Sequence, residues 1–361
     1  MKFKAGEAMR VLILGAGPTG LTAGVELARR GVHVEVIDQK QEPSKISRAV
    51  GILPSSLSVL APSGVTNNLL EEGIKIQEVR VFSGTRRALS LSLKGGHSDR
   101  DYVIALAQNR TEDILRNVLI RFGGSVVYGK KFTSLVQYED RAVIGTNDGR
   151  EYAYDMVIGA DGIKSRTREC LGIEYQGFDL PETWSIADVE ANNWPNKGVF
   201  TIFLLNGGRV VVVVPLEPDR FRVISNTEDD LATLPVPMNI ISKHRQGKFN
   251  ISIRQASYYG MGRVFLAGDA AHCHSPVGGR GMNLGISDAA ELASCITTNQ
   301  LNRYSVSRHL VGANTIAASE RARRLITSEN ILTRRTIITA CYSFNLFRFM
   351  QRSLVRVILD G

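Results

Sequence analysis

Residues 10–38 read RVLILGAGPTGLTAGVELARRGVHVEVID, and this stretch decides the fold. An apolar strand leads into a glycine turn, an amphipathic helix follows, and a second apolar strand ends on Asp38. Strand, helix and strand in this order form a βαβ unit, in which the two strands are parallel. The stretch therefore predicts a dinucleotide-binding α/β domain.

The glycine turn has the spacing that a pyrophosphate needs. Gly15 allows the tight turn, Gly17 lets a phosphate approach the backbone, and Gly20 permits close helix packing. The helix N-terminus favours the phosphate charge, and Asp38 is placed to accept hydrogen bonds from the adenosine ribose. The motif alone fits FAD and NAD equally. We expect the dinucleotide to contact Gly15, Gly17, Pro18, Thr19, Gly20, Asp38 and Gln39.

Two later motifs distinguish the cofactors: VIGADGIKSRTR at 157–168 and RVFLAGDAAHCHSPVGGRGMNLGISDAAELA at 263–293. Together with the glycine turn they resemble the group A flavoprotein monooxygenases, the family of p-hydroxybenzoate hydroxylase. The resemblance covers nearly the whole chain outside residues 181–261 and implies FAD as cofactor. It also implies that Asp161, in the DG motif, serves FAD and reduced nicotinamide binding, and that Asp269 holds the ribityl hydroxyls of FAD.

The same resemblance implies the reaction. NADPH or NADH reduces the flavin, O2 forms a flavin C4a-hydroperoxide, and an aromatic or polyketide-like small molecule is hydroxylated. Arg48 matches the family arginine that reaches the FAD, with a solvated loop arginine as the alternative. Gln108 matches a glutamine near the ribityl chain, with a polar helix face as the alternative. Because the cofactor carries the chemistry, no side chain is assigned as catalytic.

Physical chemistry supports the flavin loop at 276–283 independently. A glycine-rich loop enters a helix there, and the free N–H groups of a helix N-terminus form an anion site. Reduced flavin carries negative charge near N1 and the C2 carbonyl, which such donors would stabilise. An ordinary loop with a helix cap is the alternative. The predicted contacts in this loop are Pro276, Gly279, Gly281, Met282 and Asn283.

The remaining pattern predicts the domain organisation. Long alternating strands between about 181 and 261 indicate an antiparallel sheet, and the chain after 283 reads as helical. We predict an α/β fold: a Rossmann-like FAD-binding domain with an inserted antiparallel β-sheet substrate domain and a helical C-terminal region. The predicted FAD-binding domain comprises 9–75, 101–180 and 262–361, and the substrate domain comprises 76–100 and 181–261.

Aromatic residues of the inserted strands are the candidates for the substrate wall, although about half of such residues pack against a layer beneath. They are Trp184, Phe200, Phe203 and Phe221. The segment 226–248 is shorter than the family's usual helical segment and carries Pro235 and Pro237. This departure puts closure over the substrate in doubt.

Composition narrows the class of protein. No apolar run reaches the roughly 18 residues of a spanning helix, and the start MKFKAGEAMR leads directly into a strand, so we expect a cytoplasmic protein.

The cysteines are scattered and predict reduced thiols. Adjacent His272, Cys273 and His274 lack the spacing of a metal site, so no metal is expected. We expect a monomer or homodimer that binds a small aromatic or lipophilic substrate and no nucleic acid.

The formal net charge of +9 is concentrated in the C-terminal region, where arginines outnumber acids. An ordinary packing helix with a solvated arginine face explains this pattern. The alternative is a basic amphipathic surface that contacts anionic lipid as a peripheral membrane contact.

Alternative functions of the same fold stay open at this point. One is a flavin-dependent reductase or desaturase of a lipophilic substrate, similar to geranylgeranyl reductase. Another is a binding protein without catalysis, against which the flavin loop argues. The tryptophans, Trp184 and Trp194, do not form the motif of flavin halogenases.

Overall fold

The computed structural model describes residues 9–44, 49–94, 100–346 and 348–359. Its N-terminal part contains β1 (Arg10–Leu14), α1 (Pro18–Ala28) and β2 (His33–Asp38). β1 and β2 pair in parallel, with Arg10 opposite His33 and Leu14 opposite Ile37. The predicted βαβ unit is therefore confirmed.

A mainly parallel sheet surrounds this unit, and β18 alone pairs antiparallel within its described strands. The apolar residues of β1 and α1 are buried in one core with those of α4 (Gln108–Arg121) and α7 (Gly281–Thr297). In spatial order the strands are β18 (Gly260–Met261), β19 (Val264–Leu266), β12 (Met156–Gly159), β1, β2 and β8 (Ser125–Tyr128).

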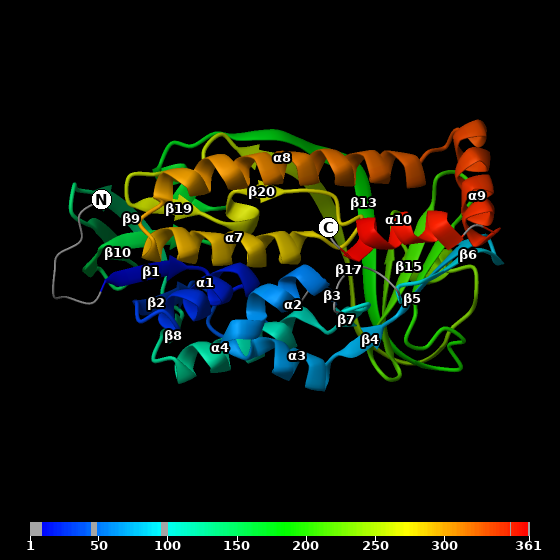
Figure 1. The fold of residues 1–361 in the computed structure, drawn as a ribbon, viewed down its shortest axis with the longest axis horizontal. Coiled ribbons are helices and arrows are strands. Elements are labelled where there is room, and N and C mark those ends of the chain that lie inside the picture. Colours follow the sequence, from blue (N-terminus) through cyan, green and yellow to red (C-terminus); the bar gives the residue numbers. More distant parts are fainter. Residues whose placement is uncertain (1–8, 45–48, 95–99, 347, 360–361) are drawn as a thin grey trace.

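A larger sheet lies at the other end of the long axis of the molecule (Figure 1). Its neighbours pair antiparallel except β14 and β5, which are parallel. The cyan hairpin of β5 and β6 thus extends a sheet built mostly from residues 175–256. In spatial order its strands are β20 (His272–Cys273), β17 (Asn239–Ala256), β13 (Tyr175–Asn192), β16 (Arg220–Ser225), β15 (Val210–Glu217), β14 (Phe200–Leu204), β5 (Glu78–Ser83) and β6 (Arg86–Ser92).

Smaller elements connect these layers. The described strands of the smaller sheets are β3 (Gly51–Ile52), β7 (Val103–Ala105) and β4 (Ile74–Ile76) in one, and β11 (Glu151–Tyr154), β10 (Ala142–Thr146) and β9 (Phe132–Gln137) in the other. The short helices are α2 (Pro54–Leu60), η1 (Ala61–Ser63), α3 (Val65–Glu72), α5 (Arg166–Cys170), α6 (Asp230–Thr233) and η2 (Gly268–Ala270).

The C-terminal region is helical, as predicted. α7 and α8 (Leu301–Ile326) run along the long axis from the parallel sheet toward the larger one (Figure 1). α9 (Ile331–Leu346) and α10 (Arg348–Leu359) follow at the end with the larger sheet. Val355 and Leu359 of α10 pack against Leu89 and Leu91 of β6. This contact favours the packing-helix interpretation of the basic C-terminal stretch.

The predicted fold class is confirmed, whereas the domain boundaries stay a prediction. Contacts cross those boundaries, because β13 begins at Tyr175, β20 joins the larger sheet, and α10 packs on β6. Among the described residues, no helix has the length and apolar character needed to cross a membrane.

The segment predicted to be short contains α6, and Pro235 and Pro237 precede β17. Its apolar residues Leu234, Val236 and Met238 pack against the cluster that contains Phe221. Because side chains alternate along a strand, this cluster lies on the sheet face opposite Trp184. The segment therefore covers the face of the larger sheet that lies opposite Trp184.

Candidate cofactor and substrate site

The predicted motifs meet at the carboxyl edge of the parallel sheet. β1, β12 and β19 end there, and each is followed by a glycine-containing turn. Gly15 has a φ of +110°, and a Cβ atom on it would lie 2.4 Å from the carbonyl oxygen of Ala160. Only glycine fits at Gly15, because the DG segment is packed directly against the turn.

Gly17 and Gly20 have different surroundings. A Cβ atom on Gly20 would lie 2.0 Å from the carbonyl oxygen of Gly15, whereas one on Gly17 would meet no atom within 4 Å. Gly17 is the N-cap of α1, and the first helical bond runs from the N–H of Leu21 to the carbonyl of Gly17. The open space at Gly17 therefore lies beside the free N–H groups of the first turn of α1, including that of Thr19. A pyrophosphate site requires this combination.

Asp38 is fixed at the end of β2. Its Oδ2 accepts a hydrogen bond from the N–H of Ala16 at 2.9 Å, and its Oδ1 accepts one from the N–H of Lys40 at 2.8 Å. Gln39 is exposed beside it. The carboxylate is thus held next to the glycine turn, where an adenosine ribose would lie in a dinucleotide-binding fold.

Asp161 has contacts that the motif alone does not reveal. Its Oδ1 accepts a hydrogen bond from Ser165 Oγ at 2.6 Å, and its Oδ2 accepts bonds from the N–H and Oγ1 of Thr167, both at 2.9 Å. Buried Arg168 donates to the carbonyl oxygen of Ala270 at 2.9 Å. The DG segment therefore shapes its own turn and is bonded to the GD segment.

The GD turn packs against the first glycine motif. A Cβ on Gly268 would lie 2.5 Å from Thr19 Oγ1, and one on Gly285 of α7 would lie 2.2 Å from the same atom. Asp269 is exposed, and its carbonyl accepts a hydrogen bond from the Tyr175 hydroxyl at 2.9 Å. Three distant segments of the chain thus meet around Thr19.

The predicted flavin loop leads into α7. Gly279 has a φ of +63°, and the N–H of Leu284 makes the first helical bond, to the carbonyl of Arg280. The N–H groups of Gly281, Met282 and Asn283 therefore have no acceptor within the helix. Pro276 is exposed at the start of the loop. This geometry fits an anionic flavin edge at the α7 N-terminus.

The Asn283 side chain has a separate role. Its Oδ1 accepts a hydrogen bond from the N–H of Leu53 at 2.8 Å. Its Nδ2 donates to the carbonyl oxygens of Gly51 and Gly279, each at 2.9 Å. The side chain holds the flavin loop against β3, which leaves the backbone N–H for a ligand.

Arg48 lies outside the described residues, but its neighbour Ala49 is placed. The N–H of Ala49 donates to Gln108 Oε1 at 3.2 Å, and Gln108 Nε2 donates to Glu112 at 2.8 Å. Burial raises the pKa of Glu112. Gln108 therefore positions the segment that follows Arg48.

The adjacent histidines of the GD segment are separated by the structure. His272 is buried, with its Nε2 2.5 Å from a carboxylate oxygen of Asp288. His274 Nδ1 is 2.8 Å from the carbonyl oxygen of Ser275, and burial lowers its pKa to about 4. The neutral imidazole of His274 therefore donates from Nδ1 to that carbonyl. Among the described residues, no group of three His, Cys, Asp or Glu side chains could hold a metal ion.

One of the candidate aromatic residues belongs to an apolar cluster that reaches the flavin loop. Trp184 belongs to an apolar cluster against which Phe249 and Val277 pack, and Val277 is part of the loop. Phe203 and Phe221 instead contact Trp194 on the opposite face, at ring distances of 6.3 Å. Phe200 packs in the clusters at the far strands of the sheet.

A buried ion pair lies on the Trp184 face of the larger sheet, and the sequence did not predict it. Arg222 Nε donates to Asp188 Oδ1 at 2.7 Å, and both side chains are almost completely buried. Arg222 also donates to the carbonyl oxygen of Ala49 at 3.4 Å, across from the larger sheet to the FAD-binding segment. Alternating strands normally carry charged residues on their solvated face, so the sequence contained no sign of this contact.

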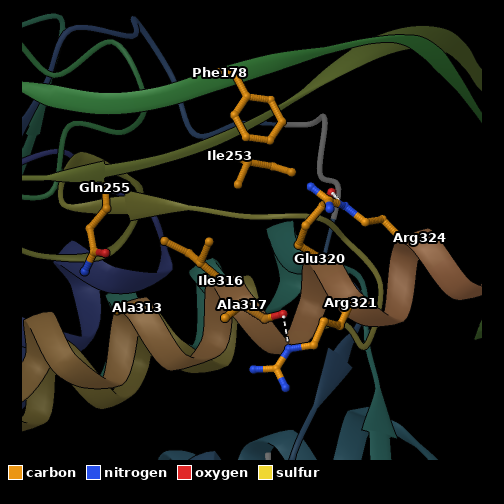
Figure 2. A pocket seen from close by; sticks show the side chains of 9 residues that line it. All are labelled: Phe178, Ile253, Gln255, Ala313, Ile316, Ala317, Glu320, Arg321 and Arg324. Atoms are coloured by element: carbon orange, nitrogen blue, oxygen red, sulfur yellow. Dashed lines mark hydrogen bonds and ion pairs between the residues drawn. The ribbon is translucent and has the colours of Figure 1, made fainter.

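A groove of about 370 Å³ lies between α8 and the ends of β13 and β17 (Figure 2). Phe178, Ile253 and Ile316 form its apolar wall, and Arg321 and Arg324 lie at its rim. Ile253 and Ile316 also contact the Trp184 cluster. The groove therefore borders the apolar layer that reaches the flavin loop.

Comparisons with known proteins agree with this arrangement. The profile of the FAD-binding domain family matches residues 8–237 and 235–319. Rifampicin monooxygenase of Streptomyces venezuelae is 31% identical over 88% of this chain and 72% of its own length. Pentachlorophenol 4-monooxygenase of Sphingobium chlorophenolicum is 33% identical over 78% of this chain and 57% of its own length.

Solved structures give the same fold. The crystal structure of p-nitrophenol 4-monooxygenase from Pseudomonas putida DLL-E4 superposes with a TM-score of 0.87 at 21% identity. The match covers 98% of each chain. Likeness at this level of identity establishes the fold.

Proposed function

The chain belongs to the FAD-binding family of flavin-dependent aromatic monooxygenases, and on that basis we propose that it uses NADPH or NADH and O2 to hydroxylate an aromatic or polyketide-like small molecule. By their names, the proteins compared above are monooxygenases of rifampicin, pentachlorophenol and p-nitrophenol. Bound FAD supplies the electron transfer and the oxygen activation.

The packing of the DG turn against Gly15, and of the GD turn and α7 against Thr19, is the observation that carries this proposal. In this arrangement the α1 N-terminus holds the pyrophosphate and Asp38 holds the adenosine ribose. Asp269 is exposed beside the same turn and holds the ribityl hydroxyls. Asp161 contributes by shaping the DG turn, since both of its oxygens accept bonds there.

The N-terminus of α7 stabilises negative charge on the flavin. Backbone N–H groups of Gly281, Met282 and Asn283 meet the flavin edge, where their partial positive charge favours the reduced, anionic form. The Asn283 side chain fixes this loop against β3. The donors are therefore held in position before the reaction, which is what electrostatic stabilisation of a developing charge requires.

Trp184, Phe249 and Ile224 form the substrate side of the site, in the apolar cluster against which Val277 of the flavin loop also packs. An apolar aromatic wall would hold a flat substrate beside the flavin and exclude water from the reacting centre. The groove bordered by Ile253 and Ile316 is the approach to this wall from solvent.

The test is a screen of phenols and polyketide aromatics with the FAD-loaded protein. We expect at least one compound to stimulate NADPH or NADH oxidation, with O2 consumption and hydroxylated product in stoichiometric amounts. Catalase detects uncoupled peroxide, which would otherwise be counted as turnover. Oxidation of NAD(P)H without O2, with reduction of the added compound, would instead establish the reductase alternative.

A pair of variants tests the substrate wall. Trp184→Leu is expected to raise KM for the stimulating aromatic, because it removes an aromatic ring from the cluster against which Val277 packs. Phe203→Leu is the matched control, since Phe203 is equally buried on the opposite sheet face. An unchanged KM in Trp184→Leu, or an equal rise in both variants, would remove Trp184 from the site.

A further inference from the structure

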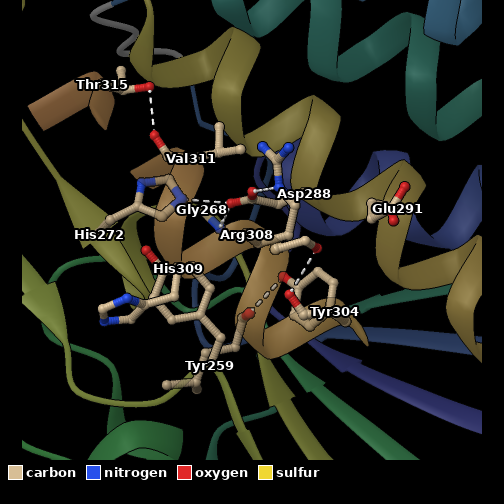
Figure 3. Close-up of polar contacts among 12 residues, drawn as sticks. Tyr259, Gly268, His272, Asp288, Glu291, Tyr304, Arg308, His309, Val311 and Thr315 are labelled. Carbon is tan, nitrogen blue, oxygen red and sulfur yellow. Dashed lines mark hydrogen bonds and ion pairs between the residues drawn. The ribbon is translucent and has the colours of Figure 1, made fainter. Parts of the chain in front are cut away.

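Asp288 of α7 is a completely buried carboxylate that lies behind the GD turn. Its Oδ2 accepts a hydrogen bond from the N–H of Gly268 at 3.1 Å and lies 2.5 Å from Nε2 of His272. Its Oδ1 accepts a bond from Arg308 Nε at 2.6 Å (Figure 3). One carboxylate therefore connects the GD turn, β20, α7 and α8.

The charge of Asp288 is maintained by its neighbours. Burial acts to raise its pKa, but His272 and Arg308 outweigh that effect, so the pKa lies below its usual value. A buried ionised carboxylate is unfavourable unless its oxygens are fully paired. The three contacts meet that condition, and removing one of them leaves a charge poorly compensated in the core.

α8 contacts the segment that leads into the GD turn at two places. The Tyr304 hydroxyl donates to the carbonyl oxygen of Leu266 at 2.8 Å, and the N–H of Tyr259 donates to Ser305 Oγ at 3.1 Å. A Cβ on Gly312 would lie 2.3 Å from the Tyr259 hydroxyl, so α8 is packed closely here. α8 acts as a rigid support for the segment that ends in the GD turn.

The position of Gly268 matters for the first glycine motif as well. Its backbone is packed against Thr19 so closely that a Cβ atom has no room. A displacement of Gly268 would move Asp269 and would also press on Thr19 at the start of α1. The predicted cofactor contacts of Asp269 and of Thr19 therefore both depend on the position of the GD turn.

We propose that Asp288 is a positioning residue for the cofactor, and that with His272 and Arg308 it fixes the Gly268–Asp269 turn in the conformation that binds FAD. The inference rests on the proposed contact between Asp269 and FAD. It extends that site to α7 and α8, beyond the glycine motifs, and makes cofactor affinity depend on a buried ion pair between the helices.

The test is the FAD dissociation constant of the apoprotein, measured by quenching of flavin fluorescence. Asp288→Asn keeps the shape but cannot accept from all three donors. We expect FAD binding to weaken by roughly tenfold to a hundredfold, as for the loss of a hydrogen bond to a charged group. The visible spectrum of bound FAD, recorded at saturation, should shift because the flavin surroundings change.

Glu291→Gln is the matched control. Glu291 lies on the same helix and pairs with Arg303 of α8 at 3.3 Å, but this pair is more exposed than the pair of Asp288 and Arg308, and it does not link α7 to the GD turn (Figure 3 shows Glu291). We expect FAD binding within about twofold of the original protein, since exposed ion pairs contribute little. Urea unfolding of each apoprotein shows whether the variant remains folded.

Arg308→Lys provides a second variant in case Asp288→Asn does not fold. It keeps a positive charge near Asp288 but loses the fixed guanidinium geometry, so a smaller loss of FAD affinity and the same spectral shift are expected. A folded Asp288→Asn or Arg308→Lys with the FAD affinity and spectrum of Glu291→Gln would overturn the proposal.

Asp269→Asn separates this inference from the proposed cofactor site. If Asp269→Asn leaves FAD binding unchanged, the proposed site itself is wrong, and the positioning role with it. If Asp269→Asn weakens FAD binding and the Asp288 and Arg308 variants do not, only the positioning role fails. If Asp269→Asn, Asp288→Asn and Arg308→Lys all weaken FAD binding, the result supports both the proposed cofactor site and the positioning role.

Discussion

At the scale of single residues, Gly17 and Gly20 lie three positions apart in one turn and serve different purposes. Gly20 is needed for the fold, because the carbonyl of Gly15 occupies the space of its side chain. Gly17 borders open space, so nothing in the protein itself requires glycine there. An open glycine at a helix N-terminus indicates that a ligand takes up the space.

Alanine at each position separates the two purposes. Gly20→Ala should lower the free energy of unfolding by about 1–3 kcal/mol, the usual cost of overpacking. Gly17→Ala should change it by less than about 0.5 kcal/mol and raise the FAD dissociation constant at least about tenfold. Urea unfolding of the apoprotein and FAD titration measure the two effects. Normal FAD binding by Gly17→Ala would exclude a pyrophosphate at this turn.

At the scale of elements, α6 carries two neighbouring acidic residues at its start that have different surroundings. Asp229 is the N-cap and accepts a hydrogen bond from the N–H of Ala232 at 3.0 Å. Asp230 is completely buried, and burial raises its pKa to about 6. This short helix packs on the sheet face opposite Trp184, where it carries an unfavourable buried carboxylate.

The raised pKa of Asp230 makes stability depend on pH. An acid whose pKa is higher in the folded state binds its proton more tightly when folded. Its stabilising contribution is complete below about pH 4 and is lost as the pH rises through about 6. From the 2-unit difference, Asp230→Asn should raise the free energy of unfolding by about 3 kcal/mol at pH 8 and leave it unchanged near pH 4.

Urea unfolding at the two pH values checks this expectation. Comparing variant with parent at each pH is necessary, because the lowered pKa of His274 acts in the opposite direction between about pH 4 and 6.5. Glu71→Gln, at an exposed carboxylate of α3, serves as control and should have a small effect at both pH values. A gain from Asp230→Asn that does not differ between pH 4 and 8 would contradict the assigned ionisation.

At the scale of the whole molecule, the C-terminal helices tie distant segments together. α7 and α8 contact the GD segment, and α10 packs on β6 at the other end of the molecule (Figure 1). Val355, which is 3% exposed, has its apolar side chain in this contact. The apolar face of α10 is therefore used within the protein.

Truncation of that side chain tests the packing. Val355→Ala should lower the free energy of unfolding by about 1–3 kcal/mol, because it removes buried methyl groups from the contact with β6. Arg352→Ala, on the exposed side of the same helix, should change it by less than about 0.5 kcal/mol. Equal effects in urea unfolding would show that α10 is not packed on the sheet in solution.

The sequence by itself determined the elements whose signals are local. The βαβ unit, the glycine turn and the helix predicted after 283, which the structure begins at Gly281, each follow from neighbouring residues, because turn geometry and apolar periodicity act over a few positions. Fold class and family followed from these segments. They also indicated Gly15 and Gly20, whose backbone conformation or packing the structure explains.

Only the tertiary structure decided which side chains act together across the chain. Asp161 and Asn283 match a motif, yet their side chains bond within the protein. Asp288 and Arg222 carry no local signal, because their partners lie 16 or more positions away in the sequence. Alternation along a strand likewise left open which of Trp184 and Phe203 lies on the sheet face whose cluster reaches Val277. Burial and long-range pairing depend on how sheets and helices pack, and that packing is a property of the whole chain.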